Sequence, residues 1–266
     1  MNERLRGRWV LITGASSGFG AAAARAFGAA GARLLLGARR VERLERVATE
    51  ARSAGAPEAH AHVLDVTSRA SVEAFFDWVR ERLGTGTAEA ATLHVLVNNA
   101  GGALGLDPVA EGRDEDWETM LQTNVLGLLR VTRAALPLML GNPGGVILNV
   151  GSVAGHEAYE GGSAYCAAKA GERQITRVLR LELCGTGLRV CSLDPGMAET
   201  EFSLVRFKGD AARARKVYEG IQPLTAEDVA EAMVWIASRP PHVCIDEMVI
   251  KPTDQASVHK VHRRSS

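Results

Sequence analysis

Several features that would point to particular partners are missing from this sequence. Charge of neither sign is in excess, because Lys and Arg total 31 and Asp and Glu total 31, so the balance does not favour nucleic acid or an anionic membrane. No uninterrupted apolar stretch approaches the roughly 18 residues that a membrane span needs. The apolar run after Arg4, Arg6 and Arg8 leads into a glycine turn instead of a cleavage site. We therefore expect a cytoplasmic protein with no export signal and with neither nucleic acid nor a membrane as its partner.

Cysteine is also sparse, and its spacing excludes the usual metal motifs. The four cysteines form no C-x-x-C pair, and no His cluster stands beside them at zinc-ligand spacing, so we expect no metal site. Free buried thiols in a reducing compartment are the simplest interpretation. Cys166 follows Tyr165 and could be a nucleophile, although packing as a small apolar residue is the simpler hypothesis.

What the sequence does contain is a regular alternation of short apolar runs and longer amphipathic segments. Near-continuous apolar strands separated by helices are typical of a parallel sheet covered on both faces. The strand-like runs are 9–13, 33–38, 60–65, 95–98, 146–150, 188–193 and 247–250. Seven such runs predict a doubly wound α/β fold, in a single domain that spans residues 1–266.

The segments between these runs predict helices and three irregular stretches. The predicted helices are 18–30, 41–54, a helix ending near Leu83 with Ser68 or Ser71 as its cap, 114–140, 163–183 and 225–238. Pro137 should end or kink the long helix. Residues 84–91 read as a loop, and 197–223 as a flap that covers a substrate. The tail, 254–266, is either a solvated end or a docking arm.

A glycine-rich turn follows the first run and precedes an Ala-rich helix. Its residues are Gly14, Ser16, Ser17, Gly18, Phe19 and Gly20. Glycines permit a tight turn and let backbone N–H groups approach a pyrophosphate at the helix N-terminus. The spacing alone also fits a plain strand–helix turn, but the strand before it and the helix after it favour a dinucleotide site.

Two arginines at the end of the second run bear on the choice of dinucleotide. A carboxylate there would bind the ribose diol of NAD, whereas a cation accommodates a 2′-phosphate, so Arg39 and Arg40 predict NADP(H). Arg40 could instead begin a solvated helix, which makes Arg39 the better candidate. Asp65 and Val66 end the third run, where they could meet the adenine ring; Asp65 could equally start a helix.

A phenol and an ammonium group share one face of a predicted helix, because Tyr165 and Lys169 are four residues apart. A free phenol has a pKa of about 10 and is a poor catalyst at neutral pH, but a nearby cation favours the phenolate. Ser152 ends the fifth run, where its hydroxyl could bond a substrate oxygen or cap a loop. Asn124 lies inside a predicted helix, where an amide is unfavourable; it could hold a water or be exposed. The Tyr/Lys pair, together with the glycine-rich turn, indicates proton transfer coupled to a nicotinamide cofactor.

Taken together, these residues resemble the short-chain dehydrogenase/reductase family. The matching motifs occur in family order: the 13–20 turn, Asn98-Asn99-Ala100-Gly101, Asn124, Ser152, Tyr165-x-x-x-Lys169 and Pro195-Gly196. The resemblance implies one Rossmann domain with strand order 3-2-1-4-5-6-7. It implies that Tyr165 is the general acid–base, that Ser152 positions the substrate oxygen, and that Lys169 favours the phenolate and binds the nicotinamide ribose. Asn124 would hold a water that relays protons. The cofactor would also contact Asn98, Ala100, Gly101, Pro195, Gly196 and Thr200.

The last third of the chain is similar to the NADP-dependent 3-hydroxy acid dehydrogenases, through segments 200–203, 205–210 and 224–230. This similarity implies oxidation of a small 3-hydroxy acid or reduction of the matching semialdehyde. It also implies a homotetramer. A carboxylate substrate needs a cation, for which Arg206 and Lys208 are candidates, while Glu157 and Glu160 would oppose it if they face the pocket. Two alternatives stay open. One is a broad-specificity reductase of ketones or sugars; the other is a non-catalytic NADP-sensing protein, which would not need Ser152, Tyr165 and Lys169 together.

Overall fold

Seven parallel strands form one sheet in the computed structural model, which describes residues 2–84 and 92–264. The strands are β1 (Trp9–Thr13), β2 (Arg33–Ala38), β3 (Ala59–Val63), β4 (Leu93–Asn98), β5 (Val146–Val150), β6 (Arg189–Pro195) and β7 (Glu247–Ile250). Their order is β3-β2-β1-β4-β5-β6-β7, which confirms the predicted topology. Four runs have the predicted bounds, and the other three, β3, β4 and β6, begin or end one or two residues away from them.

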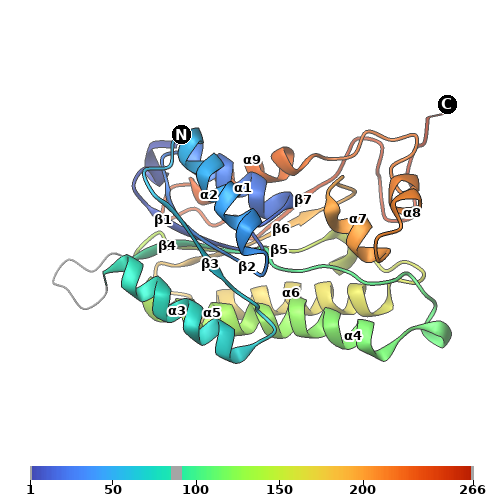
Figure 1. Cartoon of the computed structure of the whole chain (residues 1–266), viewed down its shortest axis with the longest axis horizontal. Helices are drawn as coiled ribbons and strands as arrows, with labels where there is room; N and C mark the ends of the chain where they lie inside the picture. The colour runs from blue at the N-terminus through green and yellow to red at the C-terminus, as the bar shows by residue number, and fades with distance from the viewer. Residues whose placement is uncertain (1, 85–91, 265–266) are drawn as a thin grey trace.

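Helices cover both faces of this sheet (Figure 1). One face carries α1 (Gly18–Ala29), α2 (Val41–Ala54) and α9 (Ala226–Ala237), and the other carries α3 (Arg69–Leu83), α4 (Asp114–Leu121), α5 (Gly127–Met139) and α6 (Ser163–Glu182). Each layer has its own apolar core, because strand residues alternate between the faces. Short helices complete the chain: η1 (Asn2–Leu5), η2 (Val109–Glu111), η4 (Val153–Gly155), α7 (Glu201–Arg206) and α8 (Ala211–Lys216).

The predicted caps are present at two helices. Ser68 caps α3, since its hydroxyl accepts a hydrogen bond from the Ser71 backbone N–H. Thr225 caps α9 in a reciprocal pair with Asp228, in which each side chain bonds the other residue's backbone N–H. Local sequence therefore determines where both helices begin.

The long helix expected at 114–140 is wrong in one respect, because it is interrupted. A π-helical turn, η3 (Gln122–Leu126), separates α4 from α5. Pro137 was expected to end or kink this helix, but it lies inside α5, which continues to Met139. The interruption occurs at Asn124, whose side chain bonds backbone groups that a regular helix would leave to other partners.

The irregular stretches have clear positions where the structure describes them. Residues 85–91 of the predicted loop lie outside the described residues, and so do residues 265–266 of the tail. The described part of the tail docks: the Arg264 backbone N–H donates to the Gly220 carbonyl at 2.7 Å, and Arg263 donates to the Val217 carbonyl at 3.1 Å. The tail thus contacts the segment that carries α7 and α8. Within residues 2–84 and 92–264, no helix is long and apolar enough to cross a bilayer.

Candidate active site

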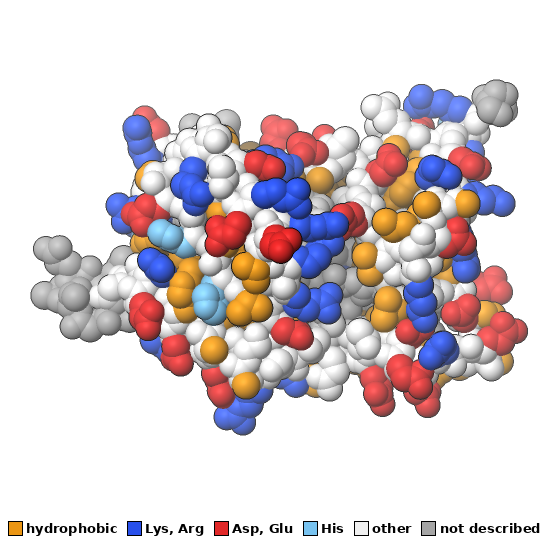
Figure 2. Space-filling model, in the orientation of Figure 1, with side chains coloured by type: hydrophobic (Ala, Val, Ile, Leu, Met, Phe, Trp, Pro, Cys, Tyr) orange, Lys and Arg blue, Asp and Glu red, His pale blue; other side chains and the backbone are white. Residues whose placement is uncertain are grey.

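A cleft of about 590 Å³ opens at the carboxyl ends of the strands. Its walls come from the glycine turn, from the ends of β2, β4, β5 and β6, and from the 197–223 segment. Figure 2 shows Lys and Arg side chains around a hollow between the α1–α2 side of the molecule and the α7 region. This is the edge of an open α/β sheet at which ligands bind.

The glycine turn is built so that backbone lies close to backbone. Gly14 has a φ of +66°, and a Cβ on it would lie 2.9 Å from the Ala100 Cα. The Thr13 hydroxyl accepts hydrogen bonds from the backbone N–H groups of Asn99 and Ala100, both at 3.0 Å. Ser17 precedes α1 without capping it through its side chain. The first N–H groups of α1 therefore remain available to a phosphate, and the turn fits a dinucleotide.

Cations line the cleft beyond this turn. Arg39 and Arg40 are both in its wall. The Arg40 guanidinium donates to the Ser17 hydroxyl at 2.6 Å and to the Glu201 carboxylate at 2.9 Å, and Arg43 donates to the other oxygen of Glu201 at 2.6 Å. Burial opposes the effect of these arginines, but they hold the pKa of Glu201 below its usual value. The sequence reasoning did not single out Arg43 or Glu201, although the 3-residue spacing of Arg40, which precedes α2, and Arg43, which lies in its first turn, was a usable signal.

Asp65 and Val66 both line the cleft, beside the cations. The Asp65 carboxylate accepts hydrogen bonds from the backbone and the hydroxyl of Thr67, at 3.0 and 2.7 Å. Burial raises the pKa of Asp65, but these hydrogen bonds outweigh it and the net pKa is low. The Asp65 carboxylate thus fixes the turn before α3 and also lies in the cleft wall. These hydrogen bonds agree with the role of a helix-start residue, and contact with the adenine ring stays a prediction.

The asparagines after β4 have different positions. Asn99, Ala100 and Gly101 line the cleft, whereas Asn98 does not. The Asn98 amide donates to the Thr132 hydroxyl and to the Asn149 side-chain oxygen, both at 2.9 Å, and so braces β4 against β5 and α5. Asn98 was predicted as a cofactor residue; its contacts in the structure are those of a buried brace.

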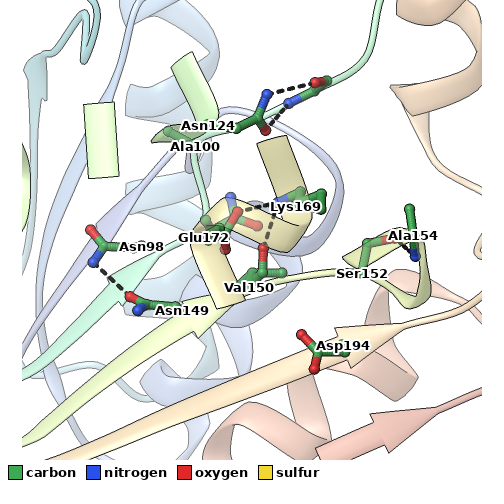
Figure 3. A network of polar contacts seen from close by, with 12 residues as sticks. Asn98, Ala100, Asn124, Asn149, Val150, Ser152, Ala154, Lys169, Glu172 and Asp194 are labelled. Atoms are coloured by element: carbon green, nitrogen blue, oxygen red, sulfur yellow. Dashed lines mark hydrogen bonds and ion pairs between the residues drawn. The ribbon is translucent and has the colours of Figure 1, made fainter. Parts of the chain in front are cut away.

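Asn124 lies in the π-helical turn, fully buried. Its Nδ2 donates to the Met120 carbonyl at 2.7 Å. Its Nδ2 also donates to the Gly102 carbonyl at 3.0 Å, and its Oδ1 accepts from the Gly102 N–H at 3.1 Å (Figure 3). The alternative that this side chain is exposed is wrong. Its Oδ1 and the Lys169 Nζ both lie within 4 Å of the point that a Cβ on Gly101 would occupy.

Ser152, Tyr165 and Lys169 all line the cleft. The Ser152 hydroxyl accepts a hydrogen bond from the Ala154 N–H at 3.1 Å and so begins η4. The Tyr165 ring packs against Phe202 of α7, with ring centroids 5.6 Å apart. The Lys169 ammonium donates to the Val150 carbonyl at 2.8 Å and to the Glu172 carboxylate at 2.7 Å (Figure 3).

Pro195, Gly196 and Thr200 line the opposite wall. Thr200 caps α7 by accepting from the Phe202 N–H at 3.1 Å. A Cβ on Gly196 would lie only 2.2 Å from the Gln255 side-chain oxygen, which accepts from the Met197 N–H at 2.8 Å. Gln255 thereby ties the tail to the start of the 197–223 segment, a contact that sequence reasoning missed.

The two candidate cations for a substrate carboxylate are in different surroundings. The Arg206 guanidinium lines the cleft, 5.7 Å from the Tyr165 ring centroid and 5.3 Å from that of Tyr159. It also donates to the Tyr159 hydroxyl at 3.0 Å, although burial has the larger effect and raises the pKa of Tyr159 to about 12. Lys208 is outside the cleft wall and forms an ion pair with Asp116 at 2.7 Å.

The two glutamates that could oppose an anionic substrate do not line the cleft. The Glu157 carboxylate accepts from the Val258 N–H at 3.1 Å and faces the tail, and Glu160 is exposed. Across residues 2–84 and 92–264, no group of three or more His, Cys, Asp or Glu side chains is placed to hold a metal ion.

The fold and the cleft together define a dinucleotide-dependent oxidoreductase of the short-chain type, and the chain belongs to the short chain dehydrogenase family, whose model matches residues 8–209. It is 40% identical over 265 residues to the NADP-dependent 3-hydroxy acid dehydrogenase of Schizosaccharomyces pombe, covering 99% of this chain and all of that protein. It is 45% identical over 248 residues to the sulfoacetaldehyde reductase of Chromohalobacter salexigens, covering 93% of this chain and 94% of that protein. Among solved structures, the closed form of serine dehydrogenase complexed with NADP+ is similar at a TM-score of 0.85 and 42% identity, covering 96% of this chain and all of that one. The resemblance drawn from the motifs is confirmed.

Proposed function

We propose that this protein is an NADP-dependent oxidoreductase that interconverts the hydroxyl group of a small 3-hydroxy acid and the matching semialdehyde. One observation carries the proposal: Ser152, Tyr165 and Lys169 line the same cleft as the glycine turn and the two arginines after β2. The names of the relatives support the same cofactor and substrate class. When bound, the nicotinamide would accept or supply the hydride.

The protein's own residues would orient the substrate and move the proton. Tyr165 would exchange a proton with the substrate oxygen, which Ser152 would hold by a hydrogen bond. Lys169 carries a positive charge on the same helix face and would favour the phenolate. Asn124 would hold a water of the proton relay, because its side chain lies beside Gly101 and close to the Lys169 ammonium.

At the other end of the cofactor, the N-terminus of α1 would bind the pyrophosphate, and Arg39 with Arg40 would bind the 2′-phosphate. Arg40 already donates to Ser17, so its guanidinium is directed toward the turn. Asp65 and Val66 would meet the adenine ring. Ala100, Gly101, Pro195, Gly196 and Thr200 would line the rest of the cofactor path.

Arg206 is our candidate for the substrate carboxylate. It stands beside the Tyr165 ring in the cleft wall, whereas Lys208 is engaged by Asp116 outside it. A carboxylate bound at Arg206 would place the hydroxyl-bearing carbon, which is two bonds from the carboxylate carbon, near the phenol of Tyr165. The 197–223 segment, which carries Arg206, would act as the flap over the substrate.

A second candidate reaction is favoured by the similarity to a sulfoacetaldehyde reductase. A sulfonate is an anion like a carboxylate, and Arg206 offers the same charge to both. Activity should therefore be measured with both kinds of anionic substrate. Reduction of sulfoacetaldehyde in preference to semialdehydes would assign the second reaction.

The test of catalysis compares the wild type with Tyr165→Phe. We expect turnover of 3-hydroxypropionate or serine with NADP+ to fall at least about 100-fold, because a positioned general acid–base contributes roughly 10²–10⁴-fold. The dissociation constant for NADP+ should change little. Retained turnover, or NADP+ binding without turnover on any substrate, would contradict the proposal.

The test of substrate binding compares Arg206→Met with Lys208→Met. Arg206→Met should raise KM for the anionic substrates about tenfold or more and leave a neutral alcohol of the same length unaffected, since one charge-assisted hydrogen bond is worth about 1.5–3 kcal/mol. Lys208→Met is the matched control and should leave both unchanged. Equal effects on anionic and neutral substrates would refute the role of Arg206.

We further propose a homotetramer of one-domain subunits in the cytoplasm. Large apolar side chains are exposed on the outer helices and on the last strand: Leu121, Leu126, Leu129, Val178, Leu181, Trp235 and Val249. Where such side chains adjoin one another they would form an apolar patch, and apolar patches mark contacts with another subunit. The thiols of Cys184 and Cys244 were expected to be buried, but both are exposed. Free exposed thiols fit a reducing compartment. Light scattering of Leu181→Glu, whose parent side chain is 79% exposed, should show a smaller assembly than the wild type.

A further inference from the structure

A buried carboxylate forms an ion pair with Lys169. Glu172 lies one turn further along α6, and its side chain is only 3% exposed. Its Oε2 is 2.7 Å from the Lys169 Nζ (Figure 3). The other buried side chains of α6 are uncharged or belong to the proposed site, so this position would ordinarily hold an apolar residue. No role described so far requires a charge there.

Two further titratable groups, Asp194 and Tyr165, act on the Lys169–Glu172 pair. Asp194 of β6 is the other buried acid that acts on both Lys169 and Glu172, and it is itself held by His156 at 2.7 Å and by the Ser192 hydroxyl at 2.6 Å. Tyr165, on the same helix, is the remaining titratable group that acts on Lys169.

The polar groups on the adjoining elements are neutral and mostly engaged with one another. Asn149 of β5 donates to Thr176 of α6 and accepts from Asn98 of β4. The Val150 carbonyl accepts from Lys169. Glu172 is thus the only carboxylate within ion-pair distance of the Lys169 ammonium among the described residues.

Burial and attraction oppose each other in this pair. Burial disfavours the charged lysine, but the Glu172 carboxylate, together with Tyr165 and Asp194, outweighs burial and raises the pKa of Lys169 above its usual value. Burial also raises the pKa of Glu172, to about 7, against the attraction of Lys169. Above neutral pH both groups are charged, and each charge stabilises the other because burial disfavours both.

We propose that Glu172 is a positioning residue for the reaction: its carboxylate fixes the Lys169 ammonium at the wall of the cleft and keeps it protonated while Tyr165 exchanges its proton. This inference rests on the proposed function of Tyr165 and Lys169. Without the carboxylate, the Val150 carbonyl would be the remaining acceptor at the ammonium, and burial would favour the neutral amine.

The low lysine content of the chain allows a direct test. Only five lysines occur, so lysine labelled with ¹³C at Cε gives five resonances, and Lys169→Arg assigns the one of interest. The Lys169 resonance of the wild type should keep its ammonium shift to above the ordinary pKa of a lysine. In Glu172→Gln it should titrate at least about one pH unit lower, a tenfold change in proton affinity.

Glu247→Gln is the matched control, because Glu247 pairs with Arg173 and Arg177 of the same helix and not with Lys169. Its Lys169 resonance should behave as in the wild type. If Glu172→Gln does not fold, Glu172→Asp keeps the charge at a shorter reach and should lower the Lys169 midpoint by a smaller amount. A midpoint that does not move in the folded variant overturns the proposal.

Kinetics separate this inference from the proposed function. The alkaline limb of the kcat profile should move to lower pH in Glu172→Gln together with the Lys169 midpoint, with KM changing much less than kcat. A shifted resonance with an unmoved alkaline limb overturns the positioning role. Retained turnover in Tyr165→Phe would instead contradict the proposed function. The shift of the Lys169 resonance in Glu172→Gln does not depend on that result.

Discussion

The buried Glu172 carboxyl should make the stability of this protein fall as the pH rises through neutrality, and replacing it with Gln should abolish that fall. Its pKa is about 7 in the folded protein, against an ordinary 4.5. The folded state therefore binds the proton more tightly than the unfolded chain does. The sign follows from linkage: the stabilisation is fully present below the unfolded pKa and is lost as the pH rises through the folded pKa.

The magnitude follows from the difference between the two values, 7 − 4.5 = 2.5 units. At about 1.36 kcal/mol per unit, the free energy of unfolding of the wild type should fall by on the order of 3 kcal/mol between about pH 4 and pH 8, relative to Glu172→Gln. Lys169 does not offset this change in the same window. Its pKa is raised above an ordinary 10.5, so its contribution stays constant until the pH is far more alkaline.

Urea unfolding at a series of pH values, at one fixed protein concentration, measures the effect. The quantity to plot is the difference in unfolding free energy between the wild type and Glu172→Gln. The control is Glu73→Gln, which removes an exposed carboxylate paired with Arg69 and should give a nearly flat difference. A flat difference for Glu172→Gln as well would refute the reasoning, because the folded and unfolded states would then bind the Glu172 proton equally.

Three further changes have definite expected outcomes. Glu201→Gln removes the acid that competes for Arg40, so calorimetric titration should show NADP+ binding up to about fivefold tighter with NAD+ unchanged; weaker NADP+ binding would contradict this. Asn124→Ala leaves the buried partners of the amide without hydrogen bonds, and urea unfolding should show a loss of about 2–3 kcal/mol. Thr225→Ala removes the α9 cap, which should reduce stability by about 1 kcal/mol and lower the melting temperature; no shift would argue against the cap.

The existence of the strands could be predicted because their physical signal is local and repeated, whereas their order in the sheet came from the family resemblance. Strands β1, β2, β4, β5 and β6 are largely buried and mostly apolar, and each strand from β1 to β5 is followed by a helix that covers one face of the sheet. The ends of the strands are less certain because pairing continues beyond the apolar run. Pro195 extends β6 in this way, since its partner Ile250 belongs to β7.

The residues of the cleft were predictable where their chemistry requires a fixed spacing. A glycine turn and a Tyr/Lys pair on one helix face depend on near neighbours in sequence, so Gly14, Tyr165 and Lys169 were found. The bridge from Arg40 to Glu201 joins residues 161 positions apart, and no local pattern encodes it. Its existence depends on where the flap is placed by the rest of the fold.

The interruption at Asn124 shows a different limit. Helix propensity identified an unfavourable amide, but the choice between a buried and an exposed side chain depends on what lies opposite. The Gly102 backbone supplies both a donor and an acceptor to it, on a loop that follows β4. A π-helical turn lets the amide reach this loop and its own Met120 carbonyl at once.

Two carboxylates hold cations at opposite ends of the cleft, and their burial should make them respond differently to salt. Glu201 is 39% exposed and pairs with Arg40 at the proposed phosphate end, so ions screen it and an incoming phosphate would displace it. Glu172 is 3% exposed, so neither salt nor a ligand can replace its hold on Lys169. Raising the ionic strength should therefore weaken the discrimination between NADP+ and NAD+ while leaving the pH dependence due to Glu172 unchanged. If salt altered both equally, the Glu172–Lys169 pair would have to be open to solvent, contrary to its burial.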